Sequence, residues 1–153
     1  MASLKPGDAA PEFSLPSAEG RPVALKELRG TKLVLFFYPK DDTPGCTKEA
    51  CSFRDNLGRI RKKGAQVAGV SPDPVASHRK FSDKFELPFL LLSDEKKDVV
   101  KAYHVWKKKS FMGKTYMGVE RTTFIIDERG NISHIFPKVK VDGHVDEVLQ
   151  CLG

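Results

Sequence analysis

Runs of apolar residues along the chain predict strands that alternate with helices. Lys32 to Tyr38 is, after its lysine, a continuous aliphatic and aromatic stretch, and Gln66 to Val70 and Phe89 to Leu92 are shorter runs of the same kind. Such runs are typical of strands that are covered on both faces. Apolar residues recur at helical spacing between these runs, which predicts helices over about residues 44–63 and 75–85.

The two ends of the chain carry shorter elements. Phe13 to Pro16 and Pro22 to Leu25 can form edge strands or a hairpin near the N-terminus. Thr122 to Ile126 and Ile132 to Phe136 are rich in β-forming residues, and the turn sequence Asp-Glu-Arg-Gly-Asn between them predicts a second hairpin. Further helices are expected over Lys96 to Tyr103 and Val145 to Leu152.

Together these elements predict a fold of the α/β class. We expect a thioredoxin-like fold, with a central mixed β-sheet flanked by helices and an N-terminal β-hairpin extension. At 153 residues the chain has the length of one ordinary domain, so residues 1–153 are expected to form a single domain. The stretch from His104 to Gly118 is basic and aromatic. Its apolar residues follow neither the alternation of a strand nor the spacing of a helix, so the pattern predicts irregular structure there.

The composition is that of a globular protein, with 40% hydrophobic and 30% charged residues. A net charge of +6 would suit an acidic partner, but the basic residues are scattered along the chain. The clusters at Arg59–Lys63 and Lys107–Lys109 lack the interleaved aromatic residues of a surface that binds single strands. Nucleic acid is therefore not expected as a partner.

No segment is expected to enter a membrane. The longest apolar runs, Leu33 to Tyr38 and Leu87 to Leu92, are far shorter than the roughly 20 residues that cross a bilayer. The N-terminus lacks the apolar region of a secretory signal, and its early Pro6 and Gly7 suit a loop. We therefore expect a cytoplasmic protein in a reducing compartment.

Three cysteines, Cys46, Cys51 and Cys151, are too few for a disulfide scaffold. In a reducing compartment such cysteines are more often buried, catalytic or redox-active than structural bridges. Cys151 shares a predicted helix with apolar positions, so we expect it to be packed or exposed rather than catalytic. The spacing Cys-x4-Cys without a nearby histidine pair falls outside the usual zinc patterns, and neither a metal nor another cofactor is expected.

Thr43-Pro44-Gly45-Cys46 stands where the strand ending at Tyr38 gives way to the long helix. Threonine is a good N-cap and proline is favoured at the first helical position, which would place Cys46 in the first turn. The free N–H groups and the dipole of that turn favour a thiolate, the nucleophilic form of cysteine. The alternative is a small buried cysteine beside a threonine that merely caps the helix, but the strand-loop-helix position favours a functional residue.

The stretch Phe37-Tyr-Pro-Lys-Asp-Asp-Thr-Pro-Gly-Cys-Thr-Lys-Glu-Ala-Cys51 resembles the peroxidatic site of the peroxiredoxins, in the branch called peroxiredoxin Q or bacterioferritin comigratory protein. Pro39, Thr43 and Cys46 match the family pattern Pro-x-x-x-Thr-x-x-Cys. Three further segments are similar to that family, namely Gly7-Asp-Ala-Ala-Pro-Glu-Phe13, Gly69-Val-Ser71 and Arg121-Thr-Thr-Phe-Ile-Ile-Asp127. The similarity covers nearly the whole chain.

The resemblance implies a thiol-dependent peroxidase of hydrogen peroxide and organic hydroperoxides that serves antioxidant defence and redox homeostasis. Cys46 would attack the peroxide and become a sulfenic acid. The Thr43 hydroxyl and the Cys46 N–H would donate to the thiolate or the peroxide, Arg121 would add a permanent charge, and Pro39 would shield the sulfur from water. Spacing alone would leave Arg121 as a solvated surface residue, and only the family pattern selects it.

The resemblance also implies that Cys51 resolves the sulfenic acid as an intramolecular disulfide, which thioredoxin then reduces, in a protein that is a monomer. In an intact helix the Cα atoms of Cys46 and Cys51 would be about 8.6 Å apart, beyond the roughly 7 Å limit of a disulfide. The first turns of the helix must therefore unwind. Gly45, Thr47 and Ser52 are modest helix formers and Pro44 has no N–H to donate, which makes such local opening plausible.

Two other functions stay open at this point. A thioredoxin-like disulfide oxidoreductase without peroxidase activity would carry Cys-x-x-Cys at this turn, whereas here the second cysteine lies two residues further on. A noncatalytic module of the same fold would bind acidic partners through its basic residues.

Arg54 is interpreted as structural, with Asp55 as a candidate partner. The basic segment from Lys107 to Lys114 would border the mouth of the site, dock an acidic reductant, or do neither.

Overall fold

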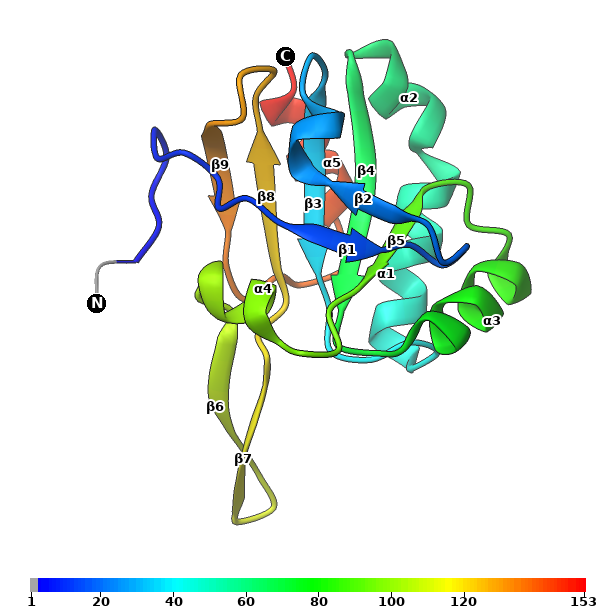
Figure 1. The fold of residues 1–153 in the computed structure, drawn as a ribbon, viewed down its shortest axis with the longest axis vertical. Coiled ribbons are helices and arrows are strands. Elements are labelled where there is room, and N and C mark those ends of the chain that lie inside the picture. The colour runs from blue at the N-terminus through cyan, green and yellow to red at the C-terminus, as the bar shows by residue number, and fades with distance from the viewer. Residues whose placement is uncertain (1–2) are drawn as a thin grey trace.

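The computed structural model describes residues 3–153. A mixed sheet of five strands forms its centre, in the order β5-β4-β3-β8-β9 (Figure 1). The strands are β3 (Lys32–Phe37), β4 (Ala65–Ser71), β5 (Leu90–Ser93), β8 (Thr122–Ile126) and β9 (Ile132–Phe136). β3 pairs in parallel with β4 and antiparallel with β8, which confirms the mixed sheet predicted from the apolar runs.

Helices cover one face of this sheet and a mixture of elements covers the other. The helices are α1 (Pro44–Asp55), α2 (Leu57–Lys62), α3 (Val75–Phe85), α4 (Asp98–Ala102) and α5 (His144–Cys151), with a 3-10 turn η1 (Leu25–Leu28). Because side chains alternate along a strand, β3 serves two cores. Val34 and Phe36 pack with α1, α2, α3 and α5, and Leu35 and Phe37 pack with α4 and the N-terminal segment. Among residues 3–153, none of these helices is long and apolar enough to cross a membrane.

Aromatic rings pack the helix face of the sheet. Phe36 of β3 stacks on Phe53 of α1, with 4.8 Å between the ring centroids. Gly69 on the neighbouring strand β4 makes room for this stack, because a Cβ built there would lie 2.7 Å from the Phe36 ring. The stack holds α1 against the centre of the sheet.

A short hairpin near the N-terminus covers the opposite face. β1 (Ser14–Pro16) pairs antiparallel with β2 (Pro22–Ala24), which confirms the predicted N-terminal extension. Figure 1 shows this hairpin crossing in front of the sheet, with α1 and α5 behind the sheet. Phe13 and Val23 are buried there in one cluster with Tyr103, which follows α4.

The prediction of one helix over residues 44–63 is wrong, because the structure has two helices that meet at Asn56. The side-chain amide of Asn56 donates to the carbonyl of Ser52 at 2.8 Å. A side chain that hydrogen-bonds the nearby backbone in this way competes with the helical ladder. The backbone of Asn56 lies outside the helical region, with φ −110° and ψ 8°, so α1 ends at Asp55.

The prediction of irregular structure between His104 and Gly118 is also wrong. β6 (Trp106–Phe111) and β7 (Lys114–Val119) form a hairpin that projects beyond the sheet, at the end where β3 finishes (Figure 1). Met112 and Gly113 have φ values of 52° and 80°, as the two central residues of a type I′ turn require. Most of this hairpin is exposed on both faces, so its strands lack the alternation from which a strand is predicted.

Candidate active site

A short loop carries the chain from β3 to the start of α1. The N–H of Tyr38 donates to the carbonyl of Val70 at 3.1 Å and keeps the end of β3 in the sheet. Pro39 follows, half-buried and unable to donate to a neighbouring strand. Thr43 is the N-cap, with an extended backbone, and Pro44 is the first residue of α1. The helix start predicted from the sequence is therefore confirmed.

Cys46 lies in the first turn of α1 and is 2% exposed. The Nη2 atom of Arg121 lies 3.3 Å from its Sγ atom. Arg121 comes from the link between β7 and β8, 75 residues further along the chain. Gly45 leaves room for the guanidinium, because a Cβ at this position would lie 3.1 Å from Nη2. The structure thus brings a cysteine at a helix start and a permanent cation into contact.

The same guanidinium holds a buried carboxyl that the sequence pattern did not single out. Nη1 of Arg121 donates to Oε1 of Glu49 at 2.7 Å, and Glu49 is 1% exposed. Burial raises the pKa of Glu49 to about 7, although Arg121 opposes this shift. Its Oε2 atom has no hydrogen-bond partner among the described residues. Glu49 shares the apolar stripe of Cys46, Ala50 and Phe53, and a charged residue on such a stripe is the signal that could have found it.

Thr43 lies where the sequence predicts it but makes a different hydrogen bond. Its hydroxyl donates to the carbonyl of Lys40 at 2.8 Å and does not cap α1. A hydroxyl has one proton and two lone pairs. In this arrangement Thr43 offers the site an acceptor, whereas the expected donation from Thr43 to the sulfur of Cys46 is not observed.

Lys109 of β6 belongs to the basic segment from Lys107 to Lys114, and the charges of Cys46 and Arg121 both act on it. Burial and the charge of Arg121 lower the pKa of Lys109, and the charges of Cys46 and Glu120 oppose that shift. The Lys109 stem lies against Gly118, with Cδ 3.4 Å from the position that a Cβ would take there. The β6–β7 hairpin therefore borders the site on one side.

Cys51 and Cys151 lie apart from this contact. Cys51 is half-buried on α1, five residues after Cys46, and α1 is unbroken between them. All three cysteines are free thiols. Because five residues of intact helix separate the two positions, the first turns must open before Cys46 and Cys51 can bond. Cys151 is half-buried at the end of α5 against the core on the helix face of the sheet.

Arg54 is structural, as interpreted from the sequence. Its Nε atom donates to Oδ1 of Asp55 at 2.9 Å, and its Nη1 atom donates to the carbonyl of Phe85 at 2.7 Å. These bonds tie the end of α1 to the end of α3. Arg54 therefore does not compete with Arg121 for the sulfur.

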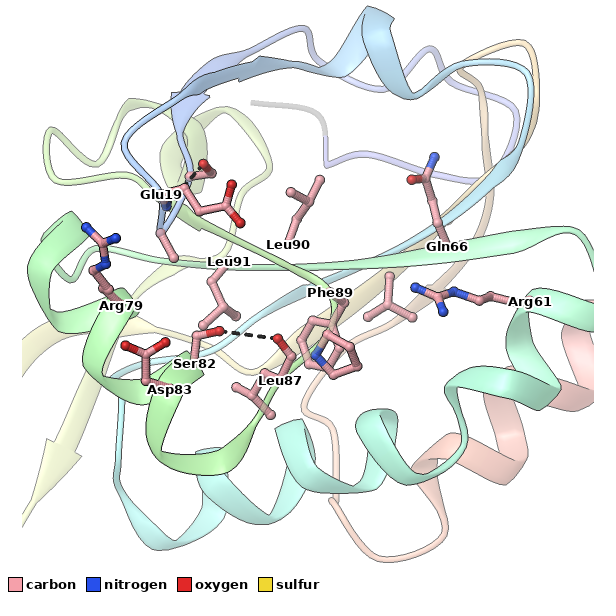
Figure 2. A pocket seen from close by; sticks show the side chains of 14 residues that line it. Glu19, Arg61, Gln66, Arg79, Ser82, Asp83, Leu87, Phe89, Leu90 and Leu91 are labelled. Atoms are coloured by element: carbon pink, nitrogen blue, oxygen red, sulfur yellow. Dashed lines mark hydrogen bonds between the residues drawn. The ribbon is translucent and has the colours of Figure 1, made fainter.

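A pocket in the surface lies apart from Cys46 and Arg121. Figure 2 shows this pocket, whose walls include α3, β5 and the β1–β2 turn. Its volume is about 640 Å³. Glu19, Arg79 and Asp83 bring charges of both signs to it. Neither Cys46 nor Arg121 lines this pocket, so it is separate from the candidate active site.

Comparison with known proteins agrees with this picture. Residues 6–135 match the AhpC/TSA family. The chain is 54% identical over 147 residues to a putative peroxiredoxin of Coxiella burnetii, and the match covers 96% of this chain and 97% of that protein. It is 46% identical over 152 residues to the peroxiredoxin Bcp of Escherichia coli K12, and the match covers 99% of this chain and 97% of that protein.

Solved structures of similar proteins extend the match to three dimensions. A mutant of Xylella fastidiosa PrxQ superposes with a TM-score of 0.93 at 35% identity, over 99% of this chain and 97% of that chain. The bacterioferritin comigratory protein of Xanthomonas campestris, studied for its alkyl peroxide reduction, superposes with a TM-score of 0.87 at 41% identity, over 92% of this chain and 89% of that chain.

The fold and these matches define a class, the thiol-dependent peroxidases built on a thioredoxin-like fold. Within that class the chain belongs to the AhpC/TSA family, as a peroxiredoxin of the Bcp/PrxQ type. The peroxidase activity that the sequence predicts is thereby confirmed. Its substrates are hydroperoxides and its electrons come from a thiol reductant.

Proposed function

We propose that Cys46 is the cysteine that reduces the peroxide in this enzyme and that Arg121 prepares it for the reaction. The observation that carries this proposal is the 3.3 Å contact between Nη2 of Arg121 and Sγ of Cys46. Free N–H groups and the dipole at the start of α1 favour a thiolate, and the guanidinium adds a positive charge beside it. The arrangement supports a nucleophile that is ionised at neutral pH.

In the first step the thiolate attacks the terminal oxygen of the hydroperoxide. An S–O bond forms as the O–O bond breaks, and the departing alkoxide or hydroxide takes up a proton. Cys46 becomes a sulfenic acid, and this two-electron oxidation of sulfur balances the reduction of the peroxide. Negative charge moves from the sulfur to the departing oxygen, and Arg121 lies close enough to stabilise it on both atoms.

Three further groups support this step. The oxygen of Thr43 accepts a hydrogen bond from the O–H of the peroxide, since its own proton is held by the carbonyl of Lys40. The N–H of Cys46 belongs to the first turn of α1, where N–H groups have no partner one turn earlier in the helix, and it can donate to a peroxide oxygen. Pro39 has no N–H and, half-buried beside the loop, shields the sulfur from water.

In the second step Cys51 attacks the sulfenic acid, which releases water and forms the Cys46–Cys51 disulfide. The residues between Pro44 and Cys51 must leave the helical conformation for this bond to form. A dithiol protein, which we propose to be thioredoxin, then reduces the disulfide and returns both thiols. The half-buried position of Cys51 supports this role, because a resolving thiol must become accessible.

We propose further that residues 1–153 work as a single domain, as a monomer, in the cytoplasm. The three free thiols suit a reducing compartment. Hydrogen peroxide and organic hydroperoxides are the proposed substrates, and the alkyl peroxide reduction studied in the Xanthomonas campestris relative supports the second class. Since the thiolate of Cys46 supplies the two electrons that reduce the peroxide, the proposed reaction needs no metal or other cofactor.

A single-turnover peroxide assay tests the assignment of Cys46. The reduced protein should consume one peroxide per Cys46 in a fast stopped-flow burst, and Cys46→Ser should abolish that burst. Cys151→Ser is the matched control, because Cys151 lies on α5 outside the site and should leave the burst unchanged. A full burst in Cys46→Ser would remove Cys46 from the chemistry.

The role of Cys51 needs a separate comparison of reductants. Cys51→Ser should still reduce peroxide when a small thiol is supplied, because the first step does not use Cys51. The same variant should lose turnover with thioredoxin, because the intramolecular disulfide cannot form. Full turnover of Cys51→Ser with thioredoxin would show that another group resolves the sulfenic acid.

A further inference from the structure

The loop before α1 contains one buried acid between two exposed residues. Asp41 is 7% exposed, whereas Lys40 and Asp42 on either side are exposed. Its Oδ1 atom accepts a hydrogen bond from the hydroxyl of Tyr38 at 2.6 Å. Its Oδ2 atom accepts from the hydroxyl of Ser77 at 2.8 Å and lies 2.7 Å from Nδ1 of His78. The carboxylate is therefore surrounded by hydrogen-bonding groups from the residue that follows β3 and from α3.

His78 faces an acceptor at each of its two ring nitrogens. Nδ1 contacts the Asp41 carboxylate, and Nε2 lies 2.8 Å from the carbonyl oxygen of Leu92 on β5. A carbonyl oxygen can only accept, so Nε2 carries an N–H and donates to Leu92. His78 is 0% exposed, and its contacts with Asp41 and Leu92 link the loop to α3 and β5 inside the protein.

The backbone of Asp41 is held as well. Its N–H donates to Oδ2 of Asp73 at 2.8 Å, and that oxygen also accepts from the hydroxyl of Ser71 at 2.7 Å. Asp41, Asp73 and His78 bring ligand atoms within 4.8 Å of one another, a spacing that would suit a metal ion. Hydrogen bonds within the cluster already use these atoms, so we interpret the group as a clamp on the loop.

The buried hydrogen bonds that hold this loop end at Asp41. Asp42 has a φ of 56°, in the left-handed region that residues other than glycine rarely adopt, and its exposed carboxylate pairs with Lys84. The first turn of α1 follows at once. At the far end, Phe53 is fully buried in its stack on Phe36. The chain from Asp42 to Phe53, which carries both redox cysteines, therefore lies between two fixed points.

The geometry points to Asp41 and His78 as positioning residues of the peroxidase. Their buried pair fixes the start of the segment that unwinds when Cys46 bonds to Cys51, with Asp42 as the hinge, and returns Cys46 to Arg121 after reduction. This inference rests on the proposed roles of the two cysteines. Neither Asp41 nor His78 contacts the sulfur, so they act on the reaction only through the path of the loop.

Asp41→Asn tests the clamp, because it keeps the shape of the side chain and removes its charge. Stopped-flow oxidation separates a first phase, which depends on peroxide concentration and reports attack by Cys46, from a second phase that reports disulfide formation. Asp41→Asn should slow the first phase by about tenfold or more, because displacement of a reacting group lowers the rate steeply. The second phase should be unchanged or faster, since unwinding becomes easier.

Asp83→Asn is the matched control, because Asp83 lies on α3 like His78 but has no place in the clamp. Asp83 is exposed and forms none of the contacts that hold Asp41, so both phases should stay within about twofold of the parent. A purely structural role of Asp41 would lower the melting temperature without separating the two phases in fully folded protein. Equal first phases in the parent and in folded Asp41→Asn, or equal slowing of both phases, would overturn the inference.

Hydrogen exchange on the unmodified protein decides the question even if Asp41→Asn fails to fold. After peroxide treatment, amides of residues 44–52 should lose protection, whereas the Asp41 amide, held by Asp73, should keep it. Exchange at Asp41 as fast as in residues 44–52 would show that the loop is not a fixed point. If the parent forms a disulfide yet the Asp41 amide opens, this inference fails while the proposed function stands.

Discussion

Arg121 contacts two groups, the carboxyl of Glu49 and the sulfur of Cys46. Its guanidinium donates to the Glu49 carboxyl and contacts the sulfur of Cys46, so one cation serves a buried acid and a nucleophile. The Glu49 carboxyl limits how much of that charge acts on the sulfur. The two contacts also fix the guanidinium in one orientation, which lysine with a single ammonium group cannot reproduce.

Replacement of Arg121 should therefore slow the oxidation step strongly. Arg121→Ala is expected to lower the second-order rate constant for oxidation of Cys46 by about a hundredfold, the usual effect of removing one donor to a developing negative charge. Arg54→Ala is the control, because Arg54 is bound to Asp55 and to the carbonyl of Phe85 instead of to the sulfur. An unchanged rate in Arg121→Ala would exclude Arg121 from the mechanism.

Glu49 should make the stability of the protein depend on pH. Burial raises the pKa of this carboxyl from 4.5 to about 7, so between these values the folded protein keeps a proton that the unfolded chain releases. The free energy of unfolding should thus fall as pH rises through this window, by on the order of 3 kcal/mol at most. Glu49→Gln should flatten that dependence. Urea unfolding at pH values on both sides of the window measures it, and equal slopes in the two proteins would contradict the assignment.

At the scale of elements, the site depends on how α1 is held against β3. The stack of Phe36 on Phe53 and the small residue Gly69 beneath it bring the helix close to the sheet. The apolar runs of the sequence predicted the strands of the central sheet, because a strand that is buried on both faces is a continuous run of apolar residues. They did not predict the break at Asn56 or the β6–β7 hairpin, since a side chain bonded to the backbone and an exposed ribbon leave no periodic signal.

The close approach at Gly69 can be tested by adding one methyl group. Gly69→Ala should destabilise the protein by about 1–3 kcal/mol, because the new Cβ would lie 2.7 Å from Phe36 in a packed core. Gly58→Ala on α2 is the matched control, since nothing lies within 4 Å of a Cβ there, and it should stabilise by about 0.4–1 kcal/mol. Urea midpoints of the two variants should therefore move in opposite directions; a neutral Gly69→Ala would show that the core is looser than described.

For the whole molecule, the exposed apolar surface is concentrated in one place. Among residues 3–153, the large hydrophobic side chains with high exposure all lie on the β6–β7 hairpin, namely Phe111, Met112, Tyr116 and Met117. Lysines at positions 107, 108, 109 and 114 flank them, and the segment from Trp106 to Val119 contains no acidic residue. Two copies that met hairpin to hairpin would therefore bring like charges together.

This distribution leads us to expect a monomer in solution. A narrow, basic hairpin is a poor match for the roughly 800 Å² that each partner of a stable complex buries. Sedimentation velocity of the reduced protein should show one species near 17.1 kDa over a wide range of concentrations. A dimer that Met112→Lys dissolves would contradict this expectation and place the interface on the hairpin.

The sequence by itself determined the elements of the central sheet and the place of Cys46 at the start of α1. These depend on short-range physics: the period of the apolar positions, the extended preference before proline, and the N-terminal signals of Thr43 and Pro44. The resemblance to the peroxiredoxins added Arg121, which neither periodicity nor spacing selects.

Only the tertiary structure decided what surrounds the sulfur. It set the contact of Arg121 with a residue 75 positions away, the burial of Glu49 with an unpartnered oxygen, and the pairing of Asp41 with His78 across 37 positions. Such contacts depend on the path of the whole chain, because groups remote in sequence meet only after the sheet and its helices have packed. The raised pKa of Glu49 likewise follows from burial, which no local pattern specifies.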